Sequence, residues 1–255
     1  MIFATMLALA AVQTAPMTPL GRWTVDYRPD MCLASRPFGA AANPTLFGLE
    51  PSVAMDSEGA MLLIVSPDSR GGGVRRGKAT IALSSGEKQA LDYVSWPLKN
   101  TPGQRAFEVT VDSDFMSKFD QSTGLSIGAG KETFALETGP FSRVLGAMKT
   151  CNDNLLRSWG IDPAARAVPV RNPGGWFTDN DYPAAARSRG AIGRVVAIVT
   201  AGPDGRVKAC RIVNSSKDAD LDMATCDLAK RRGRYKPGAD GSFGVLAIRW
   251  TMQNG

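Results

Sequence analysis

The residues of this chain best suited to covalent chemistry are its four cysteines, because the sequence contains no histidine. The lack of histidine excludes a Ser-His-Asp or Cys-His nucleophile, a histidine general base and a histidine-ligated metal. No two cysteines have the C-x-x-C spacing of a four-cysteine zinc site. In an exported protein, an even number of cysteines favours disulfides.

The spacing of the cysteines indicates how they pair, although three pairings are possible. Cys210 and Cys226 are sixteen residues apart, so proximity favours a bond between them and leaves Cys32 to pair with Cys151. Cys210 lies in an alternating, strand-like stretch and Cys226 in a helix-like one, so this bond requires a helix packed on a strand. The alternative is four buried free thiols.

A phosphate-binding motif is nearly complete between Gly72 and Lys78, where the sequence reads GGVRRGK. The glycines and the lysine match a P-loop, but Ala79 stands where a Ser or Thr should hold magnesium. The residues that follow alternate as a strand does, so no helix N-terminus is offered to a phosphate. We therefore expect a basic hairpin loop and no nucleotide or other cofactor.

Aspartates cluster at two places, and helix capping accounts for both. Asp179 and Asp181 precede a short helical stretch, and Asp218, Asp220 and Asp222 open a longer one, where the helix dipole favours negative charge. The second cluster does not have the pattern of a calcium loop. We expect no metal site, no catalytic residue and no enzyme. An enzyme with its site in the N-terminal region is the alternative.

The pattern of residues 19–161 predicts a mostly-β domain. Short apolar or alternating stretches such as AMLLIVS and RAFEVTVD recur between glycines and prolines, which is typical of a small sandwich or barrel. A helix is expected to begin near Phe141 and to end at Gly160, with Cys151 on its apolar face. A bond from Cys32 to Cys151 would fasten this helix to the first strands.

Residues 162–175 contain three prolines and a glycine pair, and they predict a linker to a second domain at 176–255. In that domain, two apolar runs joined by Gly-Pro-Asp-Gly predict a hairpin, a helix follows from Asp218, and GVLAIRWTM predicts a last strand. This order predicts a small α+β domain, a three-stranded antiparallel sheet with helices on one face.

Residues 1–18 predict a secretory signal peptide, because an apolar core from Ile2 to Val12 is followed by small residues. That core is about half as long as the ~20 residues that a membrane span needs. We expect a periplasmic protein. An uncleaved short anchor in the inner membrane and a buried first element are the alternatives.

The positive charge of the chain is concentrated in its last third. From residue 172 onward there are 13 lysines and arginines against 8 aspartates and glutamates, whereas the preceding residues are nearly balanced. No nucleic-acid-binding motif accompanies this excess, so we expect no nucleic acid partner. An acidic protein partner or a solvated basic face accounts for it better.

Residues 180–251 carry a series of short motifs in a fixed order. They are Tyr182-Pro183, Asp204-Gly205-Arg206-Val207, Leu221-Asp222 and Arg234-Tyr235-Lys236-Pro237. In this order they resemble the C-terminal domain of the TonB energy-transducer family. The resemblance implies a small periplasmic domain that binds the TonB-box strand of outer-membrane transporters by adding it to a sheet edge. The domain before it resembles no family as firmly.

The chain also departs from that family. TonB transducers carry an anchor helix with a histidine coupled to a proton-driven motor, and a long proline-rich spacer, whereas this chain has no histidine and a short linker. The resemblance therefore implies partner binding rather than the usual energy coupling. Gly233 stands where many members have tryptophan, which implies looser packing at the end of the last helix.

We expect the partner-binding site at the exposed edge of the last strand. It would consist of Val245, Ala247 and Arg249, with Arg194 and Arg211 nearby to attract an acidic partner. A TonB-dependent outer-membrane transporter is the first expected partner. The alternative is an envelope adaptor that uses the domain for assembly without energy transduction, and a homodimer stays open.

Overall fold

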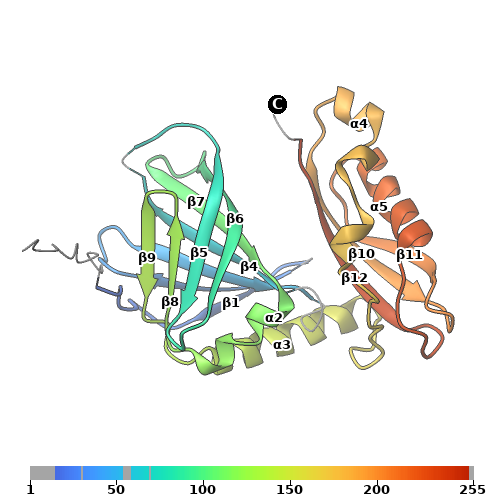
Figure 1. Cartoon of the computed structure of the whole chain (residues 1–255), viewed down its shortest axis with the longest axis horizontal. Helices are drawn as coiled ribbons and strands as arrows, with labels where there is room; N and C mark the ends of the chain where they lie inside the picture. Colours follow the sequence, from blue (N-terminus) through green and yellow to red (C-terminus); the bar gives the residue numbers. More distant parts are fainter. Residues whose placement is uncertain (1–14, 30, 54–58, 69, 253–255) are drawn as a thin grey trace, which may run out of the picture.

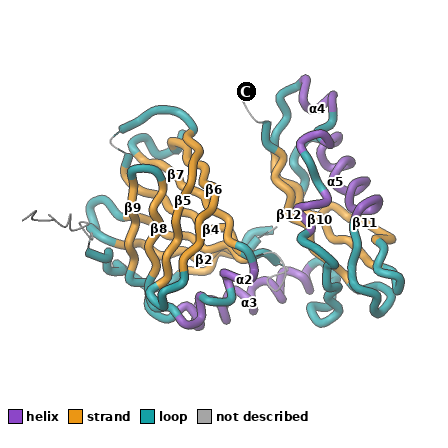
Figure 2. The backbone as a smooth tube through the Cα atoms, in the orientation of Figure 1, coloured by secondary structure: helices purple, strands orange, loops and turns teal. Residues whose placement is uncertain are grey.

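The computed structural model describes residues 15–29, 31–53, 59–68 and 70–252, which form two antiparallel sheets. Figure 1 shows a large sheet built from the first part of the chain and a small sheet, with its own helices, built from the C-terminal part. The strands of the first part and the long helix beneath them stand out in Figure 2. The predicted order, a mostly-β region followed by a small α+β region, is confirmed.

The large sheet has nine strands in the order β1-β2-β3-β4-β7-β6-β5-β8-β9. The strands are β1 (Thr24–Tyr27), β2 (Cys32–Phe38), β3 (Thr45–Pro51), β4 (Ala60–Pro67), β5 (Arg75–Leu83), β6 (Lys88–Pro97), β7 (Gln104–Val111), β8 (Leu125–Ala129) and β9 (Glu132–Leu136). Along β4, buried side chains alternate with half-buried ones, as expected for a strand with one face on a core. It is one curled sheet, a half-barrel, and not a sandwich of two.

Residues 17–20 form a seam between the two ends of this curled sheet. Beside β9, Met17 N–H donates to the Ala135 carbonyl at 2.7 Å, and Glu137 N–H donates to the Met17 carbonyl at 3.0 Å. Beside β2, Leu20 N–H donates to the Pro37 carbonyl at 2.9 Å. Two residues of the predicted signal segment, 17 and 18, therefore belong to the seam. Residues 1–14 of that segment lie outside the described residues.

A long helix, α3 (Phe141–Ser158), packs on the large sheet, and two short turns, α2 (Ser113–Met116) and η1 (Phe119–Gln121), precede β8. The apolar face of α3 is buried. Gly160, with φ of 76°, follows the end of α3 in the left-handed conformation. Cys151 on this face is bonded to Cys32 of β2, with 6.2 Å between the Cα atoms. The predicted fastening of helix to first strands is confirmed.

The small sheet has the order β11-β10-β12 and carries α5 on one face. Its elements are η2 (Pro173–Trp176), η3 (Asp179–Asp181), α4 (Ala184–Ser188), β10 (Gly193–Ala201), β11 (Val207–Asn214), α5 (Ala219–Arg232) and β12 (Phe243–Trp250). The hairpin turn from β10 to β11 closes where Gly205 N–H donates to the Gly202 carbonyl at 2.9 Å. Gly205 has φ of 76°, which suits glycine.

The second disulfide joins this sheet to its helix. Cys210 of β11 is bonded to Cys226 of α5, with 5.5 Å between the Cα atoms. Cys210 and Ile212 both pack against the cluster between sheet and helix, as the strand alternation predicts. Both predicted disulfides are thus present.

The segment 162–175, predicted as a linker, is hydrogen-bonded to the C-terminal region. Ala167 N–H donates to the Phe243 carbonyl at 2.7 Å, and Phe243 N–H donates to the Ala165 carbonyl at 2.9 Å. Further along, Lys236 N–H donates to the Val168 carbonyl at 2.7 Å. The segment therefore lies along the start of β12 and does not hang free.

Gly233, after the end of α5, fills a tight position. A Cβ atom there would lie 2.4 Å from the Ala229 carbonyl oxygen and 2.7 Å from the Val207 side chain. The buried indole of Trp176 lies against the same place. The expectation of looser packing is wrong at this position, because a tryptophan from an earlier segment fills the space.

The glycine-rich loop between β4 and β5 is organised around a buried cation. Arg105 of β7, 1% exposed, pairs with Asp68 at 2.7 Å and donates to the carbonyls of Gly71, Gly72 and Gly73 at 2.8 to 3.0 Å. These carbonyls converge on a positive charge, whereas a P-loop directs N–H groups at an anion. The polarity of this loop is therefore opposite to that of a phosphate site.

Candidate partner-binding site

The two faces of the small sheet are covered by different parts of the chain. One face packs on α5 and buries Val199 and Leu246 with Ala229 of the helix. The other face joins the core of the large sheet; its members there are Val196, Ile198, Phe243 and Val245, in one cluster with Val53, Leu155 and Leu156. Figure 1 shows β12 and β10 nearer to the large sheet than β11 and α5.

β12 is an edge strand, and alternate backbone groups of it point away from β10. The N–H and carbonyl of Phe243 bond to residues 165 and 167, so those of Val245, Ala247 and Arg249 also point outward. Within the described ranges, no backbone hydrogen bond satisfies the outward groups of Ala247 and Arg249. Such an edge offers a row of donors and acceptors to an added strand.

Two arginines lie opposite each other next to this edge. Arg194 of β10 and Arg249 of β12 are direct cross-strand partners, so both side chains lie on the face toward the large sheet. Each has a glutamate from that sheet: Arg194 pairs with Glu50 of β3 at 2.6 Å, and Arg249 pairs with Glu108 of β7 at 2.6 Å. Like charges directly opposite are destabilising, and these two carboxylates offset them.

A cleft of about 380 Å³ lies between the large sheet and the face of the small sheet that carries Arg194, Ala247 and Arg249. On one side it is lined by Arg194, Ala247, Arg249 and Thr251, and on the other by Glu50, Ser52, Gly59, Ala60, Met61, Glu108 and Thr110. The volume lies within the range of about 300–1,000 Å³ that is common for binding clefts. The edge strand β12 therefore contributes Ala247 and Arg249 to the lining of this cleft, next to its open edge.

All five residues predicted for partner binding lie on the face of the small sheet toward the large one. Val245 is 2% exposed, so it offers its backbone and not its side chain, whereas Ala247 and Arg249 line the cleft. Arg194 lines the cleft as well. Arg211 of β11 is outside it and donates to the Trp159 carbonyl at 2.6 Å. The sequence named residues of an edge strand and two of the four charged residues that line the cleft, Arg194 and Arg249, and their role in partner binding stays a prediction.

The two glutamates beside the edge were missed by the sequence analysis. Glu50 and Glu108 stand 144 and 141 positions before the arginines that they contact. Their local signal is weak: each is the one charged residue of a short, mostly apolar stretch, FGLEP in one case and AFEVT in the other. Half-buried charges of this kind require a partner, which the tertiary structure supplies.

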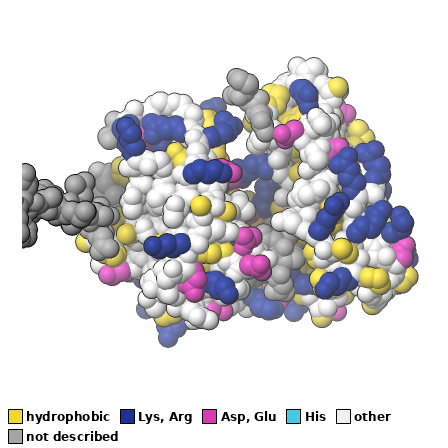
Figure 3. Space-filling model, in the orientation of Figure 1, with side chains coloured by type: hydrophobic (Ala, Val, Ile, Leu, Met, Phe, Trp, Pro, Cys, Tyr) yellow, Lys and Arg dark blue, Asp and Glu magenta, His cyan; other side chains and the backbone are white. Residues whose placement is uncertain are grey.

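The excess positive charge lies on the surface of the C-terminal region. Figure 3 shows Lys and Arg side chains gathered there. Lys230 and Arg231 at the end of α5 are exposed, where cations complement the helix dipole. This face is on α5, away from the cleft, so it is separate from the strand-edge site.

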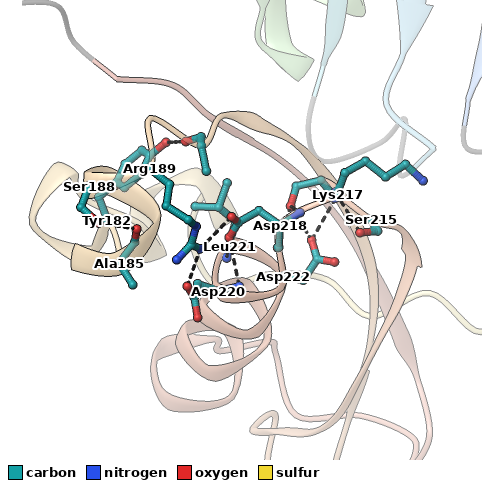
Figure 4. Close-up of polar contacts among 12 residues, drawn as sticks. Tyr182, Ala185, Ser188, Arg189, Ser215, Lys217, Asp218, Asp220, Leu221 and Asp222 are labelled. Carbon is teal, nitrogen blue, oxygen red and sulfur yellow. Dashed lines mark hydrogen bonds and ion pairs between the residues drawn. The ribbon is translucent and has the colours of Figure 1, made fainter.

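Asp218 caps the start of α5, one of the two aspartates predicted for that role. Asp218 accepts hydrogen bonds from the N–H groups of Asp220 and Leu221, and Arg189 bonds to both aspartates (Figure 4). The hydrogen bond from Arg189 lowers the pKa of Asp218. Asp222 accepts from the hydroxyl of Ser216 at 2.7 Å. Within the described part of the chain, no group of three His, Cys, Asp or Glu side chains is placed to hold a metal.

Asp181 ties the short segment before α4 to the far end of α5. Its carboxylate pairs with both terminal nitrogens of Arg232 at 2.6 and 2.7 Å, and it also accepts from Thr178 N–H at 2.8 Å. The hydrogen bonds from Arg232 and Thr178 lower the pKa of Asp181 to about 2. Capping, predicted for this aspartate, is therefore one of its two structural roles.

Comparison with known families agrees with this architecture. Residues 178–251 match the family described as Gram-negative bacterial TonB protein C-terminal. No curated protein and no solved structure matched the chain. Among the residues placed in the structure, no helix is long and apolar enough to cross a membrane.

Proposed function

We propose that the TonB-type C-terminal region at 178–251 makes this chain a non-enzymatic protein of the cell envelope that binds an extended segment of a partner protein. The observation that carries the proposal is the open edge of β12, where the outward backbone groups of Ala247 and Arg249 have no backbone partner among the described residues and both residues line a cleft. Strand addition uses such groups for affinity and the neighbouring side chains for selectivity.

Export to the periplasm fits the covalent structure. Both disulfides require an oxidising compartment, and the apolar segment at 1–18 has the features of a leader. We propose two domains, 19–161 and 176–255, joined by the hydrogen-bonded segment 162–175. Retention of the leader as an inner-membrane anchor is the competing arrangement, and the mass of the mature chain distinguishes the two.

An outer-membrane TonB-dependent transporter is the first partner that we propose, because the matched family supports it. An envelope adaptor is the second candidate, and a specific observation favours it. Apolar residues on the face of the small sheet away from α5 pack into the core of the large sheet. The C-terminal region is therefore packed against the first region and does not form a separate module. A homodimer through the same edge would compete with either partner.

The edge is tested by placing proline at position 247 of the full-length chain. Ala247→Pro removes an outward N–H but spares the ladder to β10, since Leu246 and Ile248 carry those bonds. Binding of TonB-box peptides, followed by fluorescence anisotropy, should weaken by about tenfold, as expected for a lost main-chain bond and a steric block. Ala247→Ser keeps the N–H and serves as the control. Equal affinity of both variants would refute strand addition at this edge.

The partner class is tested by photo-crosslinking in intact cells from position 247, with position 88 on β6 as the control site. Transporters recovered from position 247 and not from position 88 support the first candidate. Recovery of other envelope proteins alone supports the adaptor.

A further inference from the structure

We propose that Glu108 of the large sheet occupies the acid-binding position of the β12 edge, so that the incoming strand is an acidic segment that must exchange with this glutamate. The inference rests on the proposed function and specifies the chemistry of its partner. In this proposal, Glu108 of the large sheet competes with a carboxylate of the partner for Arg249. Three observations support it.

First, the arginine pair is held by carboxylates of the large sheet. Arg194 and Arg249 are cross-strand partners on one face, and they form ion pairs with Glu50 and Glu108 of the large sheet, respectively. Arginines placed this way recognise carboxylates. The two glutamates therefore stand where carboxylates of a partner would otherwise bind.

Second, the two ion pairs differ in how easily they can be exchanged. The side chains of Arg194 and Glu50 are 23% and 8% exposed, so this pair is held inside the contact between the sheets. The Arg249 side chain is 43% exposed, whereas that of Glu108 is 12% exposed. Because the guanidinium of Arg249 is the exposed member of its pair, a second carboxylate can reach it from solvent, whereas Arg194 is enclosed between the sheets. Arg249 is thus the residue that would recognise a carboxylate of the partner.

Third, the geometry of strand addition delivers a side chain to this position. A residue paired with Arg249 on an added strand lies on the same face, with its Cβ atom about 4.5–5.5 Å from that of Arg249. Ala247, two residues away on the same face, is small and leaves room in the cleft. A carboxylate on the added strand would therefore meet Arg249 beside Glu108.

The test uses the full-length chain, the Glu108→Gln variant and two synthetic peptides. The peptides are an alternating Thr-Val segment with glutamates on one face and its glutamine counterpart. Removing the competing charge should tighten binding of the glutamate peptide about 3- to 10-fold and change binding of the glutamine peptide less than about twofold. Glu132→Gln is the matched control, because Glu132 also pairs with a partly exposed arginine, Arg70, on another part of the large sheet.

The outcomes separate the inference from the function on which it rests. If both peptides bind the wild-type chain and Glu108→Gln leaves the glutamate peptide unchanged, or tightens both peptides equally, the inference is overturned and strand addition stands. If neither peptide binds any form of the chain at millimolar concentration, strand addition itself is rejected. Selective tightening in Glu108→Gln, without an effect in Glu132→Gln, supports the competitor role.

Discussion

The two sheets of this molecule differ in the backbone hydrogen bonding of their edge strands. The large sheet curls until residues 17–20 bridge its ends, with backbone bonds to β9 on one side and to β2 on the other. Among the described residues, the outer edge of β12 is bonded through the backbone at Phe243, whereas the outward groups of Ala247 and Arg249 have no backbone partner. Edges that are closed protect a sheet from association, whereas an edge left open is available for binding. The contrast supports the proposal that the small sheet, and not the large one, receives a partner strand.

The disulfides sharpen this contrast and give the largest expected effects on stability. Cys32–Cys151 closes a loop with a separation of 119 residues, and Cys210–Cys226 one of 16. In the chain-entropy model these crosslinks contribute about 5 and about 3 kcal/mol. We expect the Cys32→Ala/Cys151→Ala chain to lose more free energy of unfolding than Cys210→Ala/Cys226→Ala, as measured by urea denaturation. The reverse order would show that the large sheet does not depend on its long-range bond.

Opening the closed edge is expected to have a smaller effect. Met17→Pro removes the N–H that donates to the Ala135 carbonyl and leaves that carbonyl without its partner. We expect a loss of about 1–3 kcal/mol of stability, with increased self-association from the exposed edge of β9. Thermal melting and light scattering measure the two effects. Met17→Leu, which keeps the N–H, is the control, and equal behaviour of the two variants would contradict the role of the seam.

The smallest expected effect concerns the small sheet's helix. The pKa of Asp181 is lowered to about 2 by its bonds to Arg232 and Thr178. A carboxyl with a lowered folded-state pKa stabilises the fold above its ordinary pKa of about 3.9 and loses that contribution as the pH falls toward 2. Asp181→Asn should cost about 1 kcal/mol at neutral pH and flatten the decline in stability between about pH 4 and 2.

The control for this measurement is Asp240→Asn. Asp240 pairs with Lys208, and both side chains are more than half exposed, so the change should stay within about 0.5 kcal/mol. A steep decline that persists in Asp181→Asn would assign the acid sensitivity to other carboxyls.

Local patterns were sufficient for the small sheet. The turn at Gly202–Gly205, the cap at Asp218 and the strand alternation around Cys210 each agree with the structure, and together they fixed the three strands, α5 and its disulfide. These features depend on neighbours within a few residues, which a sequence displays directly.

The large sheet was predicted less completely, and the interface not at all. β2 and β3 were not among the expected strands, since LASRPF and FGLEP interrupt their apolar residues with arginine, glutamate and proline. Those charged residues contact partners that are distant in sequence: Arg36 donates to the Thr138 carbonyl, and Glu50 pairs with Arg194. Tertiary contacts of this kind outweigh local preference and leave no periodic signal.

The seam at residues 17–20 also bears on the export that we propose for this chain. A leader removed at Ala10 leaves Met17 in place, whereas a cut after Thr18 would remove the bonds between Met17 and β9. If the N-terminus is translocated first, Met17 can bond to Ala135 and Glu137 only after more than a hundred further residues have been translocated. The curled sheet cannot close before then. Until then the nascent chain exposes unpaired strands, which makes this interval the one in which a periplasmic chaperone would matter most.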